Sequence, residues 1–214
     1  MATLHVAVVD YGAGNLRSVA KALERSGAAP CVTSDPERVR GADAVVLPGV
    51  GAFRDAVQRL DAAGLDEALR EAIEVGRPYL GLCLGLQLLF EESDEHGRTP
   101  GLRLFAGRVA RFPDRDAAGE RLRVPHIGWN EVRFEGAHPV LAKLPPRDHF
   151  YFVHAYRALA ADPRDVVGRA DYGGEFASVV ARANVFAVQF HPEKSQGAGK
   201  RLLDAWVGWA GACA

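Results

Sequence analysis

The chain of 214 residues is long enough for one α/β domain with a sizeable core. Its 26 basic and 27 acidic residues nearly balance, so no overall positive charge argues for nucleic-acid binding. No apolar run approaches the ~20 residues that a membrane span needs, and we expect neither a membrane segment nor a signal peptide. The three scattered cysteines predict no disulfide framework and favour a cytoplasmic protein.

The first part of the chain alternates apolar runs with helical patterns. Four apolar runs predict buried strands, at residues 4–10, 30–33, 42–47 and 79–83. Helical periodicity is found at residues 16–23 and 53–75, and the second pattern is broken near Gly64. Strands that alternate with helices predict a doubly wound parallel sheet with helices on both faces. Ligands of such sheets bind at the carboxyl ends of the strands.

Glycine-rich loops follow the first and third strands. Gly12 and Gly14 lack the spacing of the dinucleotide-binding fingerprint, which argues against a nucleotide site. Asn15 is placed to cap the helix that follows. After the third strand, Gly49 and Gly51 leave backbone N–H groups able to turn toward a ligand. Such groups are the usual donors of an oxyanion hole in acyl transfer.

From residue 101 onward, short alternating runs replace the helical patterns. They predict antiparallel strands at one side of the main sheet, at residues 104–112, 121–127, 131–134 and 150–153. Three more strands are expected at 166–172, 176–182 and 185–189, then an amphipathic segment at 199–209. Residues 114–120 are polar and predict a loop. The spacing of His126, His138, His149 and His154 matches no metal-ligand pattern, so we predict no metal site. We expect residues 1–214 to form a single domain.

Cys83 ends the fourth strand, and a glycine lies two residues away on each side, at Gly81 and Gly85. A helical pattern follows, so the segment predicts a strand, a sharp turn and a helix. The turn places the thiol at a helix N-terminus, where the helix dipole favours the reactive thiolate. The alternative is a buried structural cysteine, and the flanking glycines argue against it.

A base is found far along the chain, where an apolar strand runs into His191-Pro192-Glu193. Proline favours an extended backbone at His191, and in an extended segment side chains two residues apart point the same way. Glu193 can therefore orient the His191 ring. A nucleophile, a base and a group that orients the base form a catalytic triad, and we predict that Cys83, His191 and Glu193 form one.

Gly81-Leu82-Cys83-Leu84-Gly85 and His191-Pro192-Glu193 resemble the motifs of the class I (triad) glutamine amidotransferase family. The resemblance covers nearly the whole chain, from residue 9 to about residue 206. It implies the α/β fold of that family, which is flavodoxin-like and doubly wound, with a mainly parallel sheet and added antiparallel strands. It also implies hydrolysis of L-glutamine through a cysteine thioester, with no cofactor.

The same resemblance assigns further residues to the site. The oxyanion hole is assigned to the N–H groups of Val50 and Leu84, with the neighbouring Gly49 and Gly51. Contacts with the substrate glutamine are assigned to Gln87, Glu95, His154, Ala155 and Tyr156. For residues 154–156 the backbone is implied to contact the α-amino acid end of the substrate.

Residues 10–15, 125–130 and 151–156 resemble the family members that serve imidazole glycerol phosphate synthase in histidine biosynthesis. This resemblance implies a heterodimer in which the glutaminase passes ammonia to a cyclase subunit, a (β/α)8 barrel. Contacts with that partner are assigned to Asn15, Trp129, Asn130, Tyr151 and Lys194. The isolated glutaminase is then expected to be nearly idle.

Three alternatives remain open. The chain could be a class I glutaminase that feeds another pathway, although residues 10–15 and 125–130 argue against it. It could be a free-standing cysteine amidohydrolase, which would turn over without a partner. It could also be a non-catalytic binding module, but such a module has no physical need for the complete set of Cys83, His191 and Glu193.

Overall fold

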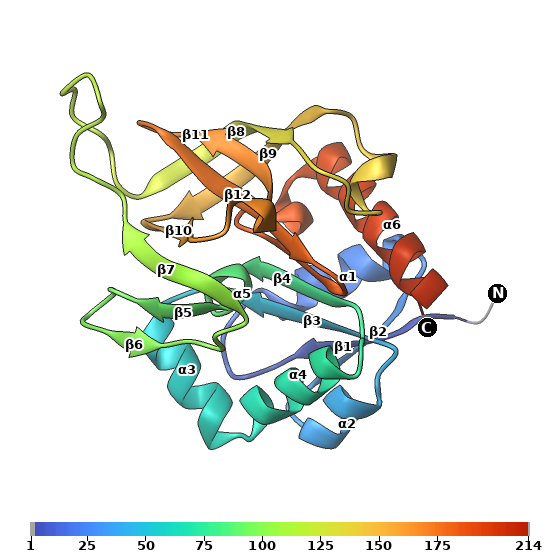
Figure 1. Cartoon of the computed structure of the whole chain (residues 1–214). Coiled ribbons are helices and arrows are strands. Elements are labelled where there is room, and N and C mark those ends of the chain that lie inside the picture. The colour runs from blue at the N-terminus through green and yellow to red at the C-terminus, as the bar shows by residue number, and fades with distance from the viewer. Residues whose placement is uncertain (1–2, 214) are drawn as a thin grey trace.

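The computed structural model describes residues 3–213, whose strands join in one sheet of 13 strands (Figure 1). Five strands at one end are parallel and lie in the order β2, β1, β3, β4, β13. Their bounds are His5–Val9 for β1, Ala29–Thr33 for β2, Ala44–Gly49 for β3, Tyr79–Cys83 for β4 and Val185–Val188 for β13. The predicted doubly wound parallel sheet is confirmed.

Helices cover both faces of these parallel strands (Figure 1). Two helices pack on one face, α1 (Leu16–Arg25) and α6 (Gln196–Cys213). Three pack on the other face, α2 (Pro36–Gly41), α3 (Phe53–Ala62) and α4 (Leu65–Glu74). Neighbouring strand residues point to opposite faces, so Val6 and Val8 join one core while Ala7 and Val9 join the other. Among the helices of residues 3–213, none is long and apolar enough to cross a membrane.

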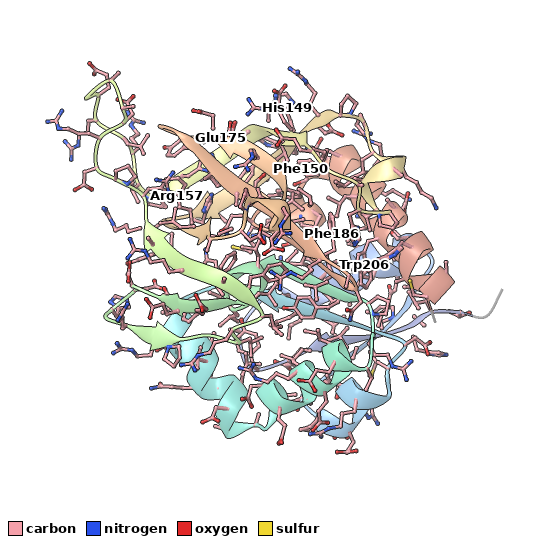
Figure 2. All side chains as sticks on the ribbon, viewed as in Figure 1. His149, Phe150, Arg157, Glu175, Phe186 and Trp206 are labelled. Carbon is pink, nitrogen blue, oxygen red and sulfur yellow. The ribbon has the colours of Figure 1, made fainter. Side chains whose placement is uncertain are left out.

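The core beneath α6 contains several of the largest buried side chains. Phe186 and Trp206 are both 0% exposed and lie inside this part of the molecule (Figure 2). Phe150 stacks on Phe190 with their ring centroids 4.0 Å apart. Because Phe190 directly precedes His191, this contact fixes the start of the segment that carries the predicted base.

The remaining strands extend the same sheet. β12 pairs antiparallel with β13, and the sheet then continues through β10, β7, β5 and β6. A branch leads from β12 through β11 to β8 and β9. The bounds are Phe90–Ser93 for β5, Thr99–Pro100 for β6, Phe105–Arg111 for β7, His126–Phe134 for β8, Arg147–His154 for β9, Tyr156–Ala160 for β10, Val166–Asp171 for β11 and Glu175–Arg182 for β12. Short 3-10 turns are η1 (Leu141–Lys143), η2 (Pro163–Asp165) and η3 (Pro192–Lys194).

The local structure differs from the expectations at three places. The helix after Cys83, α5 (Leu84–Gln87), has one turn, and the acidic residues after it begin in strand β5. Residues 121–125 belong to the loop that projects from the sheet in Figure 1, and β8 is one strand paired along its length with β9. Asn15 occupies the N-cap position of α1, but its side chain makes no capping hydrogen bond. Helix α2 was not predicted, because its six residues include a single buried side chain, Val39.

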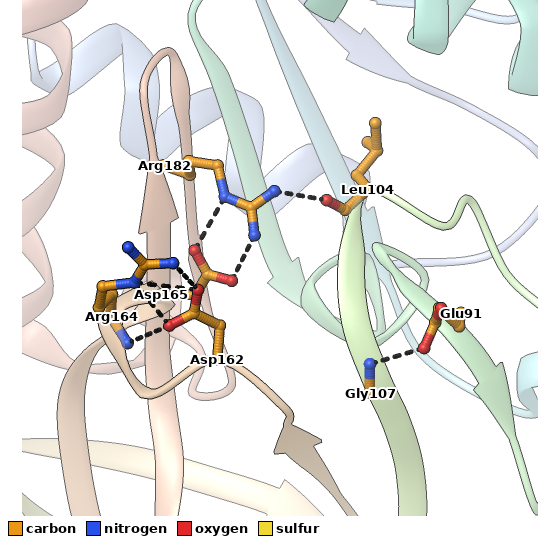
Figure 3. Close-up of polar contacts among 7 residues, drawn as sticks. All are labelled: Glu91, Leu104, Gly107, Asp162, Arg164, Asp165 and Arg182. Carbon is orange, nitrogen blue, oxygen red and sulfur yellow. Dashed lines mark hydrogen bonds and ion pairs between the residues drawn. The ribbon is translucent and has the colours of Figure 1, made fainter.

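Polar contacts join β12 to η2 and to Leu104, which directly precedes β7, and they join β5 to β7 (Figure 3). Nε of Arg182 donates to Oδ1 of Asp165 at 2.8 Å, and its Nη1 donates to the Leu104 carbonyl oxygen at 3.1 Å. Oε2 of Glu91 accepts from the Gly107 N–H at 2.8 Å. Asp165 is only 4% exposed, so Arg182 neutralises a carboxylate that would otherwise be buried alone.

Candidate active site

Cys83 lies at a sharp turn between β4 and α5, as the sequence predicts. Its backbone has φ 54° and ψ −103°, a conformation that residues with a side chain rarely adopt. Close approaches explain the flanking glycines. A Cβ on Gly85 would lie 1.9 Å from the Leu47 carbonyl oxygen, and one on Gly81 would lie 2.6 Å from the Gly85 carbonyl oxygen. Strained backbone of this kind is typical of functional sites.

The sheet brings the candidate base to the same edge. β13 lies beside β4 with Val188 opposite Leu82, so the residues that follow the two strands are neighbours. Nδ1 of His191 lies 2.9 Å from Oε1 of Glu193, and both side chains are at most 3% exposed. Since Nδ1–H donates to this carboxylate, Nε2 is the ring atom available for chemistry.

Opposing effects set the charge of His191. Burial lowers the pKa of the ring, but Cys83 and Glu193 outweigh it and raise the pKa from 6.5 to about 10. Within the described residues, Nε2 of His191 and Oε2 of Glu193 are buried without hydrogen-bond partners. We therefore attribute the raised pKa to the hydrogen bond between Nδ1 and Glu193 and to the electrostatic effect of Cys83 and Glu193, and not to a completed hydrogen bond between Sγ and Nε2. A charged imidazole here can give a proton to a leaving group.

Cys83 opens onto a cavity of about 460 Å³. Nine of the predicted site residues line it, namely Val50, Gly51, Cys83, Leu84, Gln87, Glu95, His154, Ala155 and Tyr156. Lys194, which was assigned to the partner interface, lines the cavity as well. Gly49 is adjacent, because it pairs with Cys83 in the register of β3 and β4.

The polar residues of the cavity are held by the protein itself. Nε2 of Gln87 donates to the Tyr156 carbonyl oxygen and to Oε1 of Gln189, each at 3.0 Å. Oε2 of Glu95 accepts from the Phe53 N–H at 2.7 Å. The His154 ring is engaged too, with Nδ1 2.8 Å from the Tyr156 carbonyl oxygen. The His154 ring and the Gln87 amide are thus held in place before any substrate enters.

Apart from Lys194, the residues assigned to the partner interface do not line this cavity, but Tyr151 lies next to the segment that carries His191. Trp129 is 48% exposed, and its ring centroid is 6.4 Å from that of Tyr151 on the paired strand. The Tyr151 carbonyl oxygen accepts from the His191 N–H at 2.9 Å. Nδ2 of Asn130 donates to the Asp171 carbonyl oxygen at 2.7 Å. The exposed Asn15 precedes α1, which packs against η3.

A larger and more open cavity, of about 870 Å³, shares Pro125 with the first. Arg111, Arg121 and Arg123 line it, and Nη1 of Arg111 is paired with Asp114 at 2.7 Å. Among the residues that the structure describes, its lining includes no Cys, Ser or Thr side chain, whereas the predicted nucleophile Cys83 lines the smaller cavity. Across residues 3–213, no three His, Cys, Asp or Glu side chains are grouped as metal ligands would be.

Sequence reasoning missed Gln189, whose side chain is completely buried beside the nucleophile. Its Nε2 lies 3.6 Å from Sγ of Cys83. A signal was present, because a glutamine within a buried apolar strand needs a polar partner. Its proximity to Cys83 depends on the pairing of β4 with β13, which the sequence alone did not reveal.

Comparisons with known proteins show which family the chain resembles. A family profile described as glutamine amidotransferase class-I matches residues 7–207. The imidazole glycerol phosphate synthase subunit HisH of Methylococcus capsulatus is 53% identical over 209 residues, covering 95% of this chain and 96% of the relative. HisH of Aromatoleum aromaticum is 50% identical over 210 residues, covering 96% and 98%. A crystal structure of a glutamine amidotransferase matches with a TM-score of 0.73 at 23% identity, covering 96% of this chain and 98% of that one.

The chain belongs to the class I glutamine amidotransferase family, whose fold it shares. Within that family it groups with the HisH subunits of imidazole glycerol phosphate synthase, which it matches along almost its entire length. It is therefore an enzyme of the glutaminase type.

Proposed function

We propose that this chain is the glutaminase subunit of an imidazole glycerol phosphate synthase. It hydrolyses L-glutamine to glutamate and ammonia, and a cyclase subunit consumes the ammonia in histidine biosynthesis. The observation that carries the proposal is Cys83, held at a strained turn beside the His191–Glu193 pair and open to a cavity. The names of its relatives indicate the enzyme to which the subunit belongs.

In the first half of the reaction, the Cys83 thiolate attacks the side-chain amide carbon of glutamine. The developing oxyanion is held by the N–H groups of Leu84 and Val50, in the loop that includes Gly49 and Gly51. The C–N bond then breaks, and Nε2–H of His191 gives its proton to the departing nitrogen. Ammonia leaves, and a γ-glutamyl thioester remains on Cys83.

In the second half, water cleaves the thioester. Nε2 of the now neutral His191 takes a proton from the water, whose oxygen attacks the thioester carbon. The C–S bond breaks, which releases glutamate and restores the thiolate beside the charged imidazole. Glu193 keeps the ring oriented through Nδ1 in both halves. Neither half requires a cofactor.

Substrate binding uses the polar groups around the cavity. Both N–H donors of Gln87 are already engaged, so its Oε1 is the atom that faces the substrate. The Glu95 carboxylate and the backbone of residues 154–156 bind the α-amino acid end of glutamine. This arrangement recognises a free amino acid and not a peptide.

The cyclase partner is a (β/α)8 barrel that forms a heterodimer with this chain over the exposed surface next to the cavity. That surface includes Asn15, Trp129, Asn130, Tyr151 and Lys194, and Ile127 beside them is 60% exposed. An exposed apolar surface beside the site suits a partner that receives ammonia directly. The complex works in the cytoplasm, where Cys31 and Cys213 remain free, exposed thiols.

Glutamate release from glutamine tests the proposal. The pure chain should be slow, and the rate should rise strongly when the cyclase and its nucleotide ligand are added. Cys83→Ala should abolish the rate in both conditions. A high rate in the pure chain would remove the need for a partner, and no rate in any condition would overturn the assignment.

A further inference from the structure

Gln189 is a buried polar residue that the mechanism above does not use. It follows β13 and precedes Phe190 and His191, and its backbone N–H donates to the Ser178 carbonyl oxygen at 2.8 Å. Its side chain is 0% exposed. The amide lies between two groups of the site, with Oε1 3.0 Å from Nε2 of Gln87 and Nε2 3.6 Å from Sγ of Cys83.

The orientation of both amides follows from one backbone carbonyl. The Tyr156 carbonyl oxygen can only accept, so Gln87 must turn its NH2 group toward it at 3.0 Å. The same NH2 group faces Gln189, which must therefore present Oε1 to it. The NH2 group of Gln189 is left facing Cys83. Reversing either amide would place two acceptors or two donors against each other.

A pair of histidines holds the far end of this chain of hydrogen bonds. Nδ1 of His154 lies 2.8 Å from the Tyr156 carbonyl oxygen, and its Nε2 lies 3.0 Å from Nδ1 of His126. Burial lowers the pKa of His154 to about 3 and that of His126 to about 4, so both rings are neutral. His154 then donates through Nδ1 and accepts through Nε2, and His126 donates to it. The Tyr156 carbonyl oxygen therefore accepts from His154 as well as from Gln87.

We propose that Gln189 is a positioning residue for the nucleophile. Its amide N–H donates to Sγ of Cys83, stabilises the thiolate and holds the sulfur toward the cavity. A hydrogen bond to an anionic acceptor is about twice as strong as one between neutral groups, so the contact favours the reactive form over the thiol. This inference rests on the proposed glutaminase function, and it assigns the activation of Cys83 to an amide as well as to His191.

Gln189→Glu is the sharpest variant, since it preserves the shape and the acceptor for Gln87 but replaces the donor to sulfur by an acceptor. In the complex with the cyclase, we expect iodoacetamide to alkylate Cys83 about tenfold to a hundredfold more slowly than in the wild type. The ultraviolet absorbance of the thiolate, measured against Cys83→Ser, should fall in parallel. The kcat for glutamine should fall while KM stays the same, because the Gln87 contact is kept.

Gln189→Met and Ser178→Ala complete the set. Gln189→Met removes both contacts, so kcat should fall and KM should rise. Ser178 is also 0% exposed, and within the described residues its hydroxyl has no partner. Ser178→Ala therefore perturbs the same neighbourhood without touching the amide chain, and alkylation and kinetics should match the wild type.

A folded Gln189→Glu protein that is alkylated at the wild-type rate would overturn the proposal. If that variant does not fold, the side-chain amide of Gln189 can be followed by nitrogen-15 NMR in the wild type. Its resonances should shift when iodoacetamide alkylates Cys83, and unchanged resonances would contradict the proposal. The alkylation experiment needs no glutamine, so it separates failure of this inference from failure of the proposed reaction.

Discussion

At the scale of single residues, the charge of His191 is set by groups that meet only in the folded chain. Cys83 and Glu193 raise its pKa to about 10 against the effect of burial. The charged ring therefore makes its full contribution to the free energy of unfolding below pH 6.5, its ordinary pKa. This contribution is lost as the pH rises through about 10. The alkaline limit of activity should follow the same proton, because His191 must be charged to release ammonia.

Glu193→Gln removes the negative charge of the carboxylate that is hydrogen-bonded to His191. The pKa of the ring should fall, so the alkaline limb of kcat/KM in the complex should move to lower pH, and kcat should drop by about a hundredfold. The measurement is the pH profile of glutamate release. Glu175→Gln, which changes a surface carboxylate paired with Arg133, should leave the limb in place. If the alkaline limb of the pH profile lies at the same pH in Glu193→Gln as in the wild type, Glu193 does not control the pKa of His191.

Two buried tyrosines give opposite predictions for stability. Among the described residues, the Tyr11 hydroxyl has no partner, whereas the Tyr79 hydroxyl donates to the Gly85 carbonyl oxygen at 2.9 Å. Tyr11→Phe should raise the free energy of unfolding by about 1 kcal/mol, and Tyr79→Phe should lower it by about 1–2 kcal/mol. Denaturant unfolding of both variants measures the difference. A loss of stability in Tyr11→Phe would mean that its hydroxyl is bonded in solution.

At the scale of elements, the turn between β4 and α5 depends on a side chain being absent. A Cβ at position 85 would lie 1.9 Å from the Leu47 carbonyl oxygen of β3. Gly85→Ala should therefore lower the free energy of unfolding by about 3 kcal/mol and reduce glutamate release. Gly211→Ala is the control, because no atom lies within 4 Å of its added Cβ and helix α6 favours alanine. Equal stability of the two variants would contradict the close packing of the turn.

The parallel strands could be predicted from sequence because each contains a short apolar run, which is rich in valine in β1, β3 and β13, while α3 and α4 showed helical periodicity around Gly64. The elements that were missed lack such signals. Helix α2 has six residues and a single buried side chain, and β5 contains two acidic residues at the outer part of the sheet. The triad residues were predicted from local motifs. Gln189 could not be, because its role depends on which strands pair.

At the scale of the whole molecule, one exposed surface stands beside the active site. Trp129 is 48% exposed next to Tyr151, and its side chain contributes little to the core. Trp129→Ala should leave the melting temperature unchanged and weaken binding of the cyclase by about tenfold or more, since exposed tryptophans are common hot spots. Titration calorimetry with the cyclase measures the affinity.

Val75→Ala is the matched control for that surface. Val75 is 72% exposed and is the C-cap residue of α4, a helix on the side of the molecule away from β8 (Figure 1). Its removal should change neither stability nor affinity. If Trp129→Ala binds the cyclase as tightly as Val75→Ala does, the partner occupies another surface.

The central claim is that Cys83 carries the glutamyl group, and it can be tested with a reactive glutamine analogue such as 6-diazo-5-oxonorleucine. The complex with the cyclase is treated with the analogue, digested and analysed by mass spectrometry. We predict one modified peptide, which contains Cys83, and loss of glutamate release in proportion to its modification. The exposed Cys31 and Cys213 serve as internal controls and should remain unmodified. Modification of either control, or continued glutamate release after Cys83 is fully modified, would contradict the account.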